Sequence, residues 1–193
     1  MINIVVFASG NGSNFKEIYI RTLKKEIKGI IVLLISNNPK SGAVKFAKEN
    51  NIKFEVINLY RFKNSLDKQY EIVLKKHKTD LILLAGFMKK IPKNIIQIYK
   101  NKIMNIHPSL LPKYGGKGFY GSNVHNAVID SGDSYSGATV HYVNEEYDKG
   151  SVIKQEKVKI EPSDNSKTLA EKVLIIEHKI YSEAIKIFCE KRI

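Results

Sequence analysis

Apolar runs separated by amphipathic segments fill the first half of the chain. Residues 2–8, 27–36 and 80–85 are mostly apolar, and residues 53–57 form a shorter run. Such runs are typical of parallel strands that are buried on both faces. Between them the pattern predicts helices over about 15–25, 41–50 and 66–76. The repeating strand–helix order predicts a mostly parallel sheet with right-handed crossovers and helices on both faces.

The second half has a different pattern. Residues 102–104 predict a short strand, and residues 124–130 a short helix. Residues 137–143 and 151–160 alternate between apolar and polar positions, which predicts an antiparallel pair joined by an acidic loop over 144–150. A long helix is expected to end near residue 191. We therefore expect one Rossmann-like α/β domain over 1–193, with a parallel half over 1–100 and a second half over 101–193.

Two helix starts have the spacing of a capping box, in which a short polar side chain and a glutamate three residues later satisfy the first backbone N–H groups. Asn14 and Glu17 have this spacing before the first helix. Thr168 and Glu171 have it before the last helix. The pattern predicts that Asn14 and Thr168 cap these helices.

The composition is typical of a globular protein from a reducing compartment. It has 193 residues, of which 43% are hydrophobic, a length that suffices for one well-buried core. No run of about 18 apolar residues occurs, so we expect no membrane span. Cys189 is the only cysteine, which excludes an internal disulfide and fits the cytoplasm. The N-terminus enters a strand directly, so we expect no signal peptide and a cytoplasmic location.

The net charge of +13 raises the question of nucleic-acid binding. The lysines are spread over nearly every segment, and only three arginines are present, although arginine is the usual specific reader of bases and phosphates. We interpret the charge as a lysine-rich solvated surface that also attracts small anions. We expect no specific nucleic-acid partner and no membrane partner.

A glycine-rich turn, Gly10–Asn14, connects the first strand to the first helix. Such a turn directs free N–H groups and the positive end of the helix dipole toward an anion. The dinucleotide-binding fingerprint needs a third glycine, but Phe15 occupies that position. The sequence therefore favours a site for a single phosphate, although a simple tight turn is an equally good interpretation.

Three polar segments follow predicted strands and converge at one sheet edge. They are residues 10–14, 86–88 and 105–107. In parallel sheets, ligands bind beyond the carboxyl ends of the strands. Asn105 and His107 are two positions apart, so both side chains leave the sheet on the same side. The sequence therefore predicts one site at this edge.

The residue types at this edge fit acyl transfer. A protonated His107 and the Asn105 amide would supply two donors to a developing oxyanion. Asp148 is the best-placed carboxylate to raise the pKa of His107 and keep it partly protonated near neutral pH. No nucleophilic serine elbow is present, and the five histidines lack metal-ligand spacing, so we expect neither covalent catalysis nor a metal. His141 lies within an alternating strand and is interpreted as structural.

Four motifs together resemble one enzyme family. They are Gly10–Asn14, Ala85–Met88, the Asn-Ile-His-Pro-Ser-Leu-Leu-Pro run over 105–112, and residues 137–141 followed by Asp148-Lys149-Gly150. In this order they resemble the glycinamide ribonucleotide transformylases, a group of folate-dependent formyltransferases. The resemblance implies transfer of a formyl group from 10-formyltetrahydrofolate to N1-(5-phospho-D-ribosyl)glycinamide in purine biosynthesis, without a metal.

The resemblance also implies roles for particular residues. It implies Asn105, His107 and Asp148 as the catalytic group. It implies a substrate-binding set at the ribonucleotide: Gly12, Ser13, Asn14 and Glu177. It implies a folate-binding set along the pterin: Met88, Lys89, Lys90, Ile91, Asn144, Glu145, Glu146 and Tyr147. Asp67 stands where the family usually has a basic residue, and Lys68 lies one position later.

Two other functions remain open from the sequence. A methionyl-tRNA formyltransferase would share the catalytic half and would explain the basic charge. A non-catalytic RNA-binding α/β module would explain the charge but not the Asn105–His107–Asp148 set. The expected partners are small-molecule substrates, and the protein is either a monomer or a homodimer.

Overall fold

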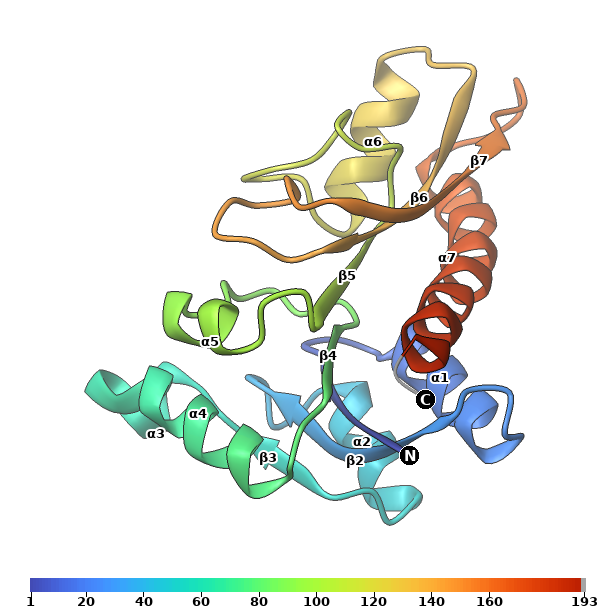
Figure 1. Cartoon of the computed structure of the whole chain (residues 1–193). Coiled ribbons are helices and arrows are strands. Elements are labelled where there is room, and N and C mark those ends of the chain that lie inside the picture. Colours follow the sequence, from blue (N-terminus) through green and yellow to red (C-terminus); the bar gives the residue numbers. More distant parts are fainter. Residues whose placement is uncertain (192–193) are drawn as a thin grey trace. The chain divides into compact units, whose positions relative to one another are not determined.

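The computed structural model describes residues 1–191 and contains seven strands, hydrogen-bonded in the order β3-β2-β1-β4-β5-β6-β7 (Figure 1). The chain folds as two compact units. Of the described residues, the first comprises residues 1–104 and 186–191, and the second comprises residues 105–185. The predicted α/β class with a mostly parallel sheet is confirmed, and the assignment of all 193 residues to a single domain stays a prediction.

The first unit is built on parallel strands. Strand β1 pairs in parallel with β2 and β4, and β2 pairs in parallel with β3. The strands are β1 (Ile2–Phe7), β2 (Gly29–Ser36), β3 (Phe54–Val56) and β4 (Leu81–Leu84). The helices are α1 (Ser13–Leu23), α2 (Gly42–Glu49), α3 (Leu59–Phe62), α4 (Leu66–Lys76) and α5 (Lys93–Ile98), with a 3-10 turn at Lys63–Ser65.

Aromatic contacts show how helices cover this part of the sheet. The ring of Phe7 at the end of β1 lies 5.6 Å from that of Tyr70 in α4 and 5.1 Å from that of Phe87. Phe15 of α1 packs edge-on against Phe46 of α2. Tyr70 is almost fully buried, and burial raises the pKa of its hydroxyl to about 12. The apolar runs of the sequence therefore form the core, as their pattern predicts.

The second unit contains the end of β5 and the predicted antiparallel pair. Its elements are β5 (Ile103–His107), which starts in the first unit, α6 (Ser122–Asp130), β6 (Tyr135–Tyr142), β7 (Val152–Lys159) and most of α7 (Ser166–Glu190). Strands β6 and β7 are antiparallel, which confirms the prediction. Helix α7 runs alongside them (Figure 1), and ion pairs from Lys179 to Glu156 and from Lys154 to Glu183 join it to β7.

Both predicted capping boxes are wrong. Helix α1 starts two residues early, at Ser13, after Gly12 in a left-handed conformation, and its cap residue makes no side-chain hydrogen bond. Before α7, the side chain of Asn165 accepts hydrogen bonds from the N–H groups of residues 167 and 168, so Asn165 is the cap rather than Thr168. In both places a neighbouring residue already occupies the cap position, so the expected side chain lies inside the helix.

The sequence pattern did not predict the short helices or the full length of β5. Helices α3 and α5 contain only four and six residues, too few for an apolar stripe to repeat. Strand β5 extends to His107, beyond the predicted 102–104 segment, so Asn105 and His107 lie on the strand itself. Within residues 1–191, no helix is long and apolar enough to cross a membrane.

Candidate active site

The last residues of β5 place an amide and an imidazole on one side of the strand. Asn105 and His107 are separated by Ile106, and strand geometry turns alternate side chains to opposite faces. His107 is only 4% exposed, whereas Asn105 is half-buried. The predicted pairing of these two side chains is therefore present in the fold.

Asp148 is brought to the same place by the β6–β7 loop. Its backbone is left-handed, with φ of 55°, which turns the carboxylate back toward β5. Asn105 Nδ2 donates to Oδ1 at 3.3 Å, and the backbone N–H of Gly116 donates to Oδ2 at 2.9 Å. Nδ1 of His107 lies 3.6 Å from Oδ2. Asn105 and His107 of the predicted catalytic group thus both lie beside the carboxylate of Asp148.

His141 completes the cluster, although the sequence analysis interpreted it as structural. Its Nδ1 lies 2.8 Å from the carbonyl of Tyr142, and its Nε2 lies 3.2 Å from Asn105 Nδ2 and 3.5 Å from Asp148 Oδ1. The only available signal was its inward position in the alternating strand, in phase with Thr139. That signal places a side chain in the interior but does not identify its neighbours.

The carbonyl of Tyr114 determines how His107 is protonated. This carbonyl lies 2.7 Å from His107 Nε2, and a carbonyl oxygen only accepts, so Nε2 carries a proton and donates it. In the neutral ring Nδ1 is then the basic nitrogen. Because Nδ1 faces Asp148, this is the atom at which His107 gains and loses a proton.

The net pKa shift of His107 is opposite to the one expected from the sequence. Burial lowers the pKa of His107, and the charge of Asp148 and the Tyr114 carbonyl, which both raise it, do not compensate. Proximity to His141 lowers this pKa further. The expectation that Asp148 holds His107 partly protonated near neutral pH is therefore wrong. Sequence spacing identified the partner but contained no measure of how deeply the ring is buried.

Asp148 remains ionised in this cluster. Burial alone raises the pKa of its carboxyl group. The hydrogen bond with His141, the proximity of His107 and the Gly116 N–H together outweigh burial, so the net effect lowers the pKa of Asp148. The cluster thus combines an imidazole, a carboxylate and an amide, with the amide hydrogen-bonded to the carboxylate and the imidazole 3.6 Å from it.

A second buried histidine lies close to His107. His125 of α6 is 6% exposed, and its Nδ1 has no hydrogen-bond partner among residues 1–191. Burial lowers the pKa of His125, and the charge of His107 lowers it further. No role for His125 was expected from the sequence, because nothing in its helical pattern distinguishes it from a core residue.

In the first unit, the structure joins two of the predicted site segments. The N–H of Met88 donates to the hydroxyl of Ser9 at 2.8 Å, and the N–H of Ser9 donates to the carbonyl of Gly86 at 3.1 Å. Gly12 has a positive φ of 71°, and an added Cβ would lie 2.9 Å from that of Ala43. The turn therefore requires glycine at position 12, and α1 begins directly after it.

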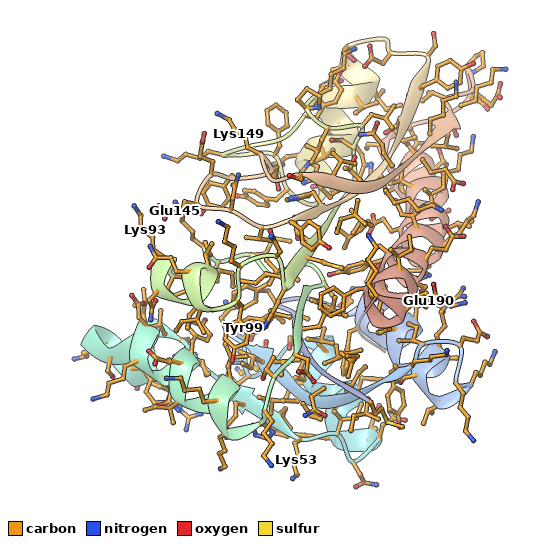
Figure 2. All side chains as sticks on the ribbon, in the orientation of Figure 1. Lys53, Lys93, Tyr99, Glu145, Lys149 and Glu190 are labelled. Atoms are coloured by element: carbon orange, nitrogen blue, oxygen red, sulfur yellow. The ribbon has the colours of Figure 1, made fainter. Side chains whose placement is uncertain are left out.

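The proposed ligand-binding residues differ in exposure. Met88, Lys89 and Lys90 are exposed, whereas Ile91 is buried. The four loop residues before Asp148 are exposed, and Figure 2 shows the side chains of Glu145 and Lys149 extending outward from this loop. Glu177 lies within α7 and is half-buried. Their predicted roles toward substrate and folate stay predictions.

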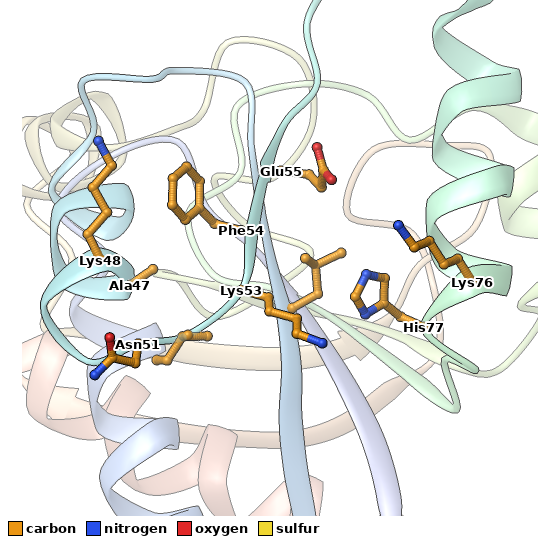
Figure 3. Close-up of a pocket in the computed structure, with 10 residues that line it drawn as sticks. Ala47, Lys48, Asn51, Lys53, Phe54, Glu55, Lys76 and His77 are labelled. Carbon is orange, nitrogen blue, oxygen red and sulfur yellow. The ribbon is translucent and has the colours of Figure 1, made fainter.

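A separate cavity of about 550 Å³ lies in the first unit beside the edge strand β3 (Figure 3). Three lysines line it together with His77, and the ends of Lys53 and Lys76 approach the His77 ring from two sides. Lys48 lies over the ring of Phe54. Within residues 1–191, no group of three or more His, Cys, Asp or Glu side chains has the arrangement of a metal site.

Comparison with known proteins shows one consistent family. The family model described as "Formyl transferase" matches residues 2–185. The chain is 42% identical over 193 residues to "Phosphoribosylglycinamide formyltransferase, chloroplastic" of Arabidopsis thaliana, covering 98% of this chain and 66% of that protein. The chain therefore spans just under two thirds of this plant relative.

Bacterial relatives are covered more fully. The chain is 37% identical over 195 residues to the phosphoribosylglycinamide formyltransferase of Haemophilus influenzae, covering 100% of this chain and 90% of that one. The crystal structure of glycinamide ribonucleotide transformylase 1 from Symbiobacterium toebii superposes with a TM-score of 0.92 at 29% identity, covering 100% and 89% of the two chains.

Proposed function

The chain belongs to the formyl transferase family, and from that premise we propose that it transfers the formyl group of 10-formyltetrahydrofolate to the amine of glycinamide ribonucleotide. The products are the N-formyl ribonucleotide and tetrahydrofolate, which makes the reaction a step of purine biosynthesis. The names of the plant and bacterial relatives support this reaction.

The observation that carries the proposal is the convergence of polar groups on Asp148. Asn105 Nδ2, His107 Nδ1, His141 Nε2 and the Gly116 N–H all lie within 3.6 Å of its two oxygens. Polar groups are costly to bury unless they form hydrogen bonds. An apolar core would therefore not hold four of them around one carboxylate without such bonds. The arrangement suits a reaction in which charge develops on an oxygen and a proton moves nearby.

Asn105 supplies the donor for the oxyanion. When the substrate amine attacks the formyl carbon, the carbonyl oxygen gains negative charge. Asn105 Nδ2 lies 3.2 Å from His141 Nε2 and donates to Asp148 Oδ1 at 3.3 Å. At 3.3 Å the bond to Asp148 is longer than a typical N–H···O hydrogen bond, and in the proposed reaction the formyl oxygen replaces Asp148 as the acceptor.

His107 and Asp148 move the proton. The lowered pKa keeps His107 neutral at rest, so Nδ1 accepts a proton from the attacking amine as the C–N bond forms. The adjacent carboxylate of Asp148 stabilises the resulting imidazolium. As the bond from the formyl carbon to folate N10 breaks, N10 takes up the proton, directly or through a bound water. One proton thus passes from the substrate amine to tetrahydrofolate.

Binding of the two substrates is assigned to the remaining predicted residues. Gly12, Ser13 and Asn14 hold the ribonucleotide phosphate, because α1 starts at Ser13 and its cap makes no side-chain hydrogen bond that would compete with an anion. Glu177 lies near the glycinamide amine. The folate pterin contacts residues 88–91 and the exposed loop over 144–147.

One assay tests the proposed function against its nearest alternative. The protein is mixed with 10-formyltetrahydrofolate and either glycinamide ribonucleotide or charged initiator tRNA, and formation of tetrahydrofolate is followed. We expect turnover when glycinamide ribonucleotide is the acceptor and none when the tRNA is the acceptor. Turnover only with the tRNA would replace the proposal with the tRNA-formylating activity, and turnover with neither would overturn both.

A further inference from the structure

Tyr114 is held at both ends of the residue, although it lies in the loop that follows β5. Its hydroxyl lies 2.6 Å from Ser131 Oγ and 3.0 Å from Asp133 Oδ2. Its carbonyl lies 2.7 Å from His107 Nε2. One residue therefore connects the turn between α6 and β6 to the imidazole of the candidate active site.

The anchoring end is reinforced by charge. Lys113 Nζ lies 3.1 and 3.0 Å from the two oxygens of Asp133. This contact and the Tyr114 hydroxyl lower the pKa of Asp133, so its carboxylate stays charged. The ring of Tyr114 also meets that of Phe119 edge-on, with 6.0 Å between centroids. The tyrosine side chain is thus fixed by hydrogen bonds and by packing.

The backbone at Tyr114 needs this support. Its φ is 54°, in the left-handed region, where residues with a Cβ are disfavoured. The direction of its carbonyl depends on this conformation. The hydroxyl of the buried Ser109 donates to the carbonyl of Lys113 at 2.6 Å and holds the preceding peptide. An unfavourable conformation persists where surrounding contacts determine it, and such positions cluster at functional sites.

We propose that Tyr114, tethered through its hydroxyl to Asp133 and Ser131, is a positioning residue that fixes the orientation and tautomer of His107. The proposal rests on the proposed formyl transfer, in which Nδ1 of His107 exchanges the proton. The Tyr114 carbonyl binds the proton at Nε2 and so leaves Nδ1 as the atom facing Asp148. Without the tether the carbonyl loses its fixed direction, and the ring populates both tautomers.

A structural role alone predicts something different. If the tether only stabilised the loop, its loss would lower the melting temperature and leave the chemistry of His107 unchanged. A positioning role predicts a change at the ring nitrogens. The groups that face His107 in the second unit are Asp148, His141, His125 and the Tyr114 carbonyl. Of these, the tether acts directly on the Tyr114 carbonyl alone.

Tyr114→Phe removes the hydroxyl and keeps the ring and the carbonyl. We expect kcat to fall about fivefold, the loss typical of one hydrogen bond, with KM for both substrates nearly unchanged. The Tyr114 carbonyl raises the pKa of His107, so its displacement moves the acid limb of the pH–rate profile to lower pH. Tyr60→Phe is the matched control, because Tyr60 is 92% exposed, and we expect it to alter nothing.

NMR of the ¹⁵N-labelled histidines gives the decisive readout without substrate. In the wild type we expect His107 to carry its proton on Nε2 alone, and in Tyr114→Phe to show both tautomers. Asp133→Ala removes this acceptor of the hydroxyl and repeats the test with the tyrosine intact, in case Tyr114→Phe does not fold. Unchanged ¹⁵N shifts and an unchanged pH profile would overturn the proposal even if the melting temperature falls. Failure of formyl transfer in the wild type would instead overturn the proposed function, because the NMR result does not depend on it.

Discussion

His77 and His107 have a lowered pKa in common, but their surroundings differ. His77 follows α4 and is partly exposed. Burial lowers its pKa first, the positive charges of Lys53 and Lys76 lower it further, and Glu55 opposes them. His107 is buried, and its pKa is lowered by burial against the opposing charge of Asp148. One ring is surrounded by repelling charges, and the other by partners that stabilise its protonated form.

The difference separates the histidine of the candidate active site from one whose pKa is merely perturbed. Like charges lower a pKa without any directed contact, as in the open cavity around His77 (Figure 3). At His107 each ring nitrogen faces a defined oxygen, one on Tyr114 and one on Asp148. A perturbed pKa by itself is therefore a weak indicator of a functional site, whereas a perturbed pKa with directed partners on both ring nitrogens is a stronger one.

The largest expected effect comes from neutralising the carboxylate beside His107, compared with neutralising the one beside His77. In the proposed mechanism, Asp148→Asn removes the charge that stabilises the imidazolium of His107. We expect kcat to fall by about a hundredfold or more, the order of losing a key electrostatic group in an active site. Because Asp148 raises the pKa of His107, the acid limb of the pH–rate profile should move to lower pH.

Glu55→Gln is the matched control for this experiment, since Glu55 raises the pKa of His77 in the same way. Steady-state kinetics across pH should show no change in kcat for this variant. Equal losses in both variants, or near-normal turnover of Asp148→Asn, would contradict the distinction between the two histidines.

The next effect concerns stability in acid. The folded protein lowers the pKa of His107, so the unfolded chain binds the proton more readily. The contribution of neutral His107 is fully present above its unfolded pKa of about 6.5 and is lost as pH falls below that value. The slope approaches at most about 1.4 kcal/mol per pH unit for one proton.

Urea unfolding of His107→Asn at pH 7.5 and pH 5.5 measures this contribution. We expect the variant to lose less stability than the wild type between these two values. His77→Asn should have a smaller effect of the same sign, because His77 is partly exposed. If His107→Asn and the wild type lost the same stability between pH 7.5 and pH 5.5, His107 would not be the group whose protonation destabilises the folded protein in acid.

The smallest effect tests the cause of the His77 shift. Raising the salt concentration from about 0.05 to 0.5 M shortens the Debye length and screens exposed charges. The repulsion from Lys53 and Lys76 should weaken, so the pKa of His77 should rise toward its usual value. The pKa of His107 should change little, because its ring and the Asp148 side chain are largely buried, where salt screens charges less. NMR titrations at the two salt concentrations would measure both pKa values. A salt-dependent shift of His107 as large as that of His77 would contradict the burial of His107.

Much of the fold follows from the local pattern of residues. The apolar runs before Gly10 and Gly86 became β1 and β4, helix α4 occupies residues 66–76 as its amphipathic stripe predicts, and β6 and β7 form the expected antiparallel pair. These features depend on the periodicity of burial, which the order of residues carries directly. Helix starts were less predictable, because adjacent polar residues such as Asn165 and Thr168 compete for the same cap position.

The candidate site divides in the same way. The sequence by itself determined that Asn105 and His107 share one side of a strand, and its resemblance to a known family pointed to Asp148. Only the tertiary structure brought His141, Gly116 and the Tyr114 carbonyl to these residues and buried the His107 ring deeply enough to lower its pKa. The reason is physical: alternation along a strand is a local property, whereas burial and the identity of a hydrogen-bond partner depend on segments distant in the chain.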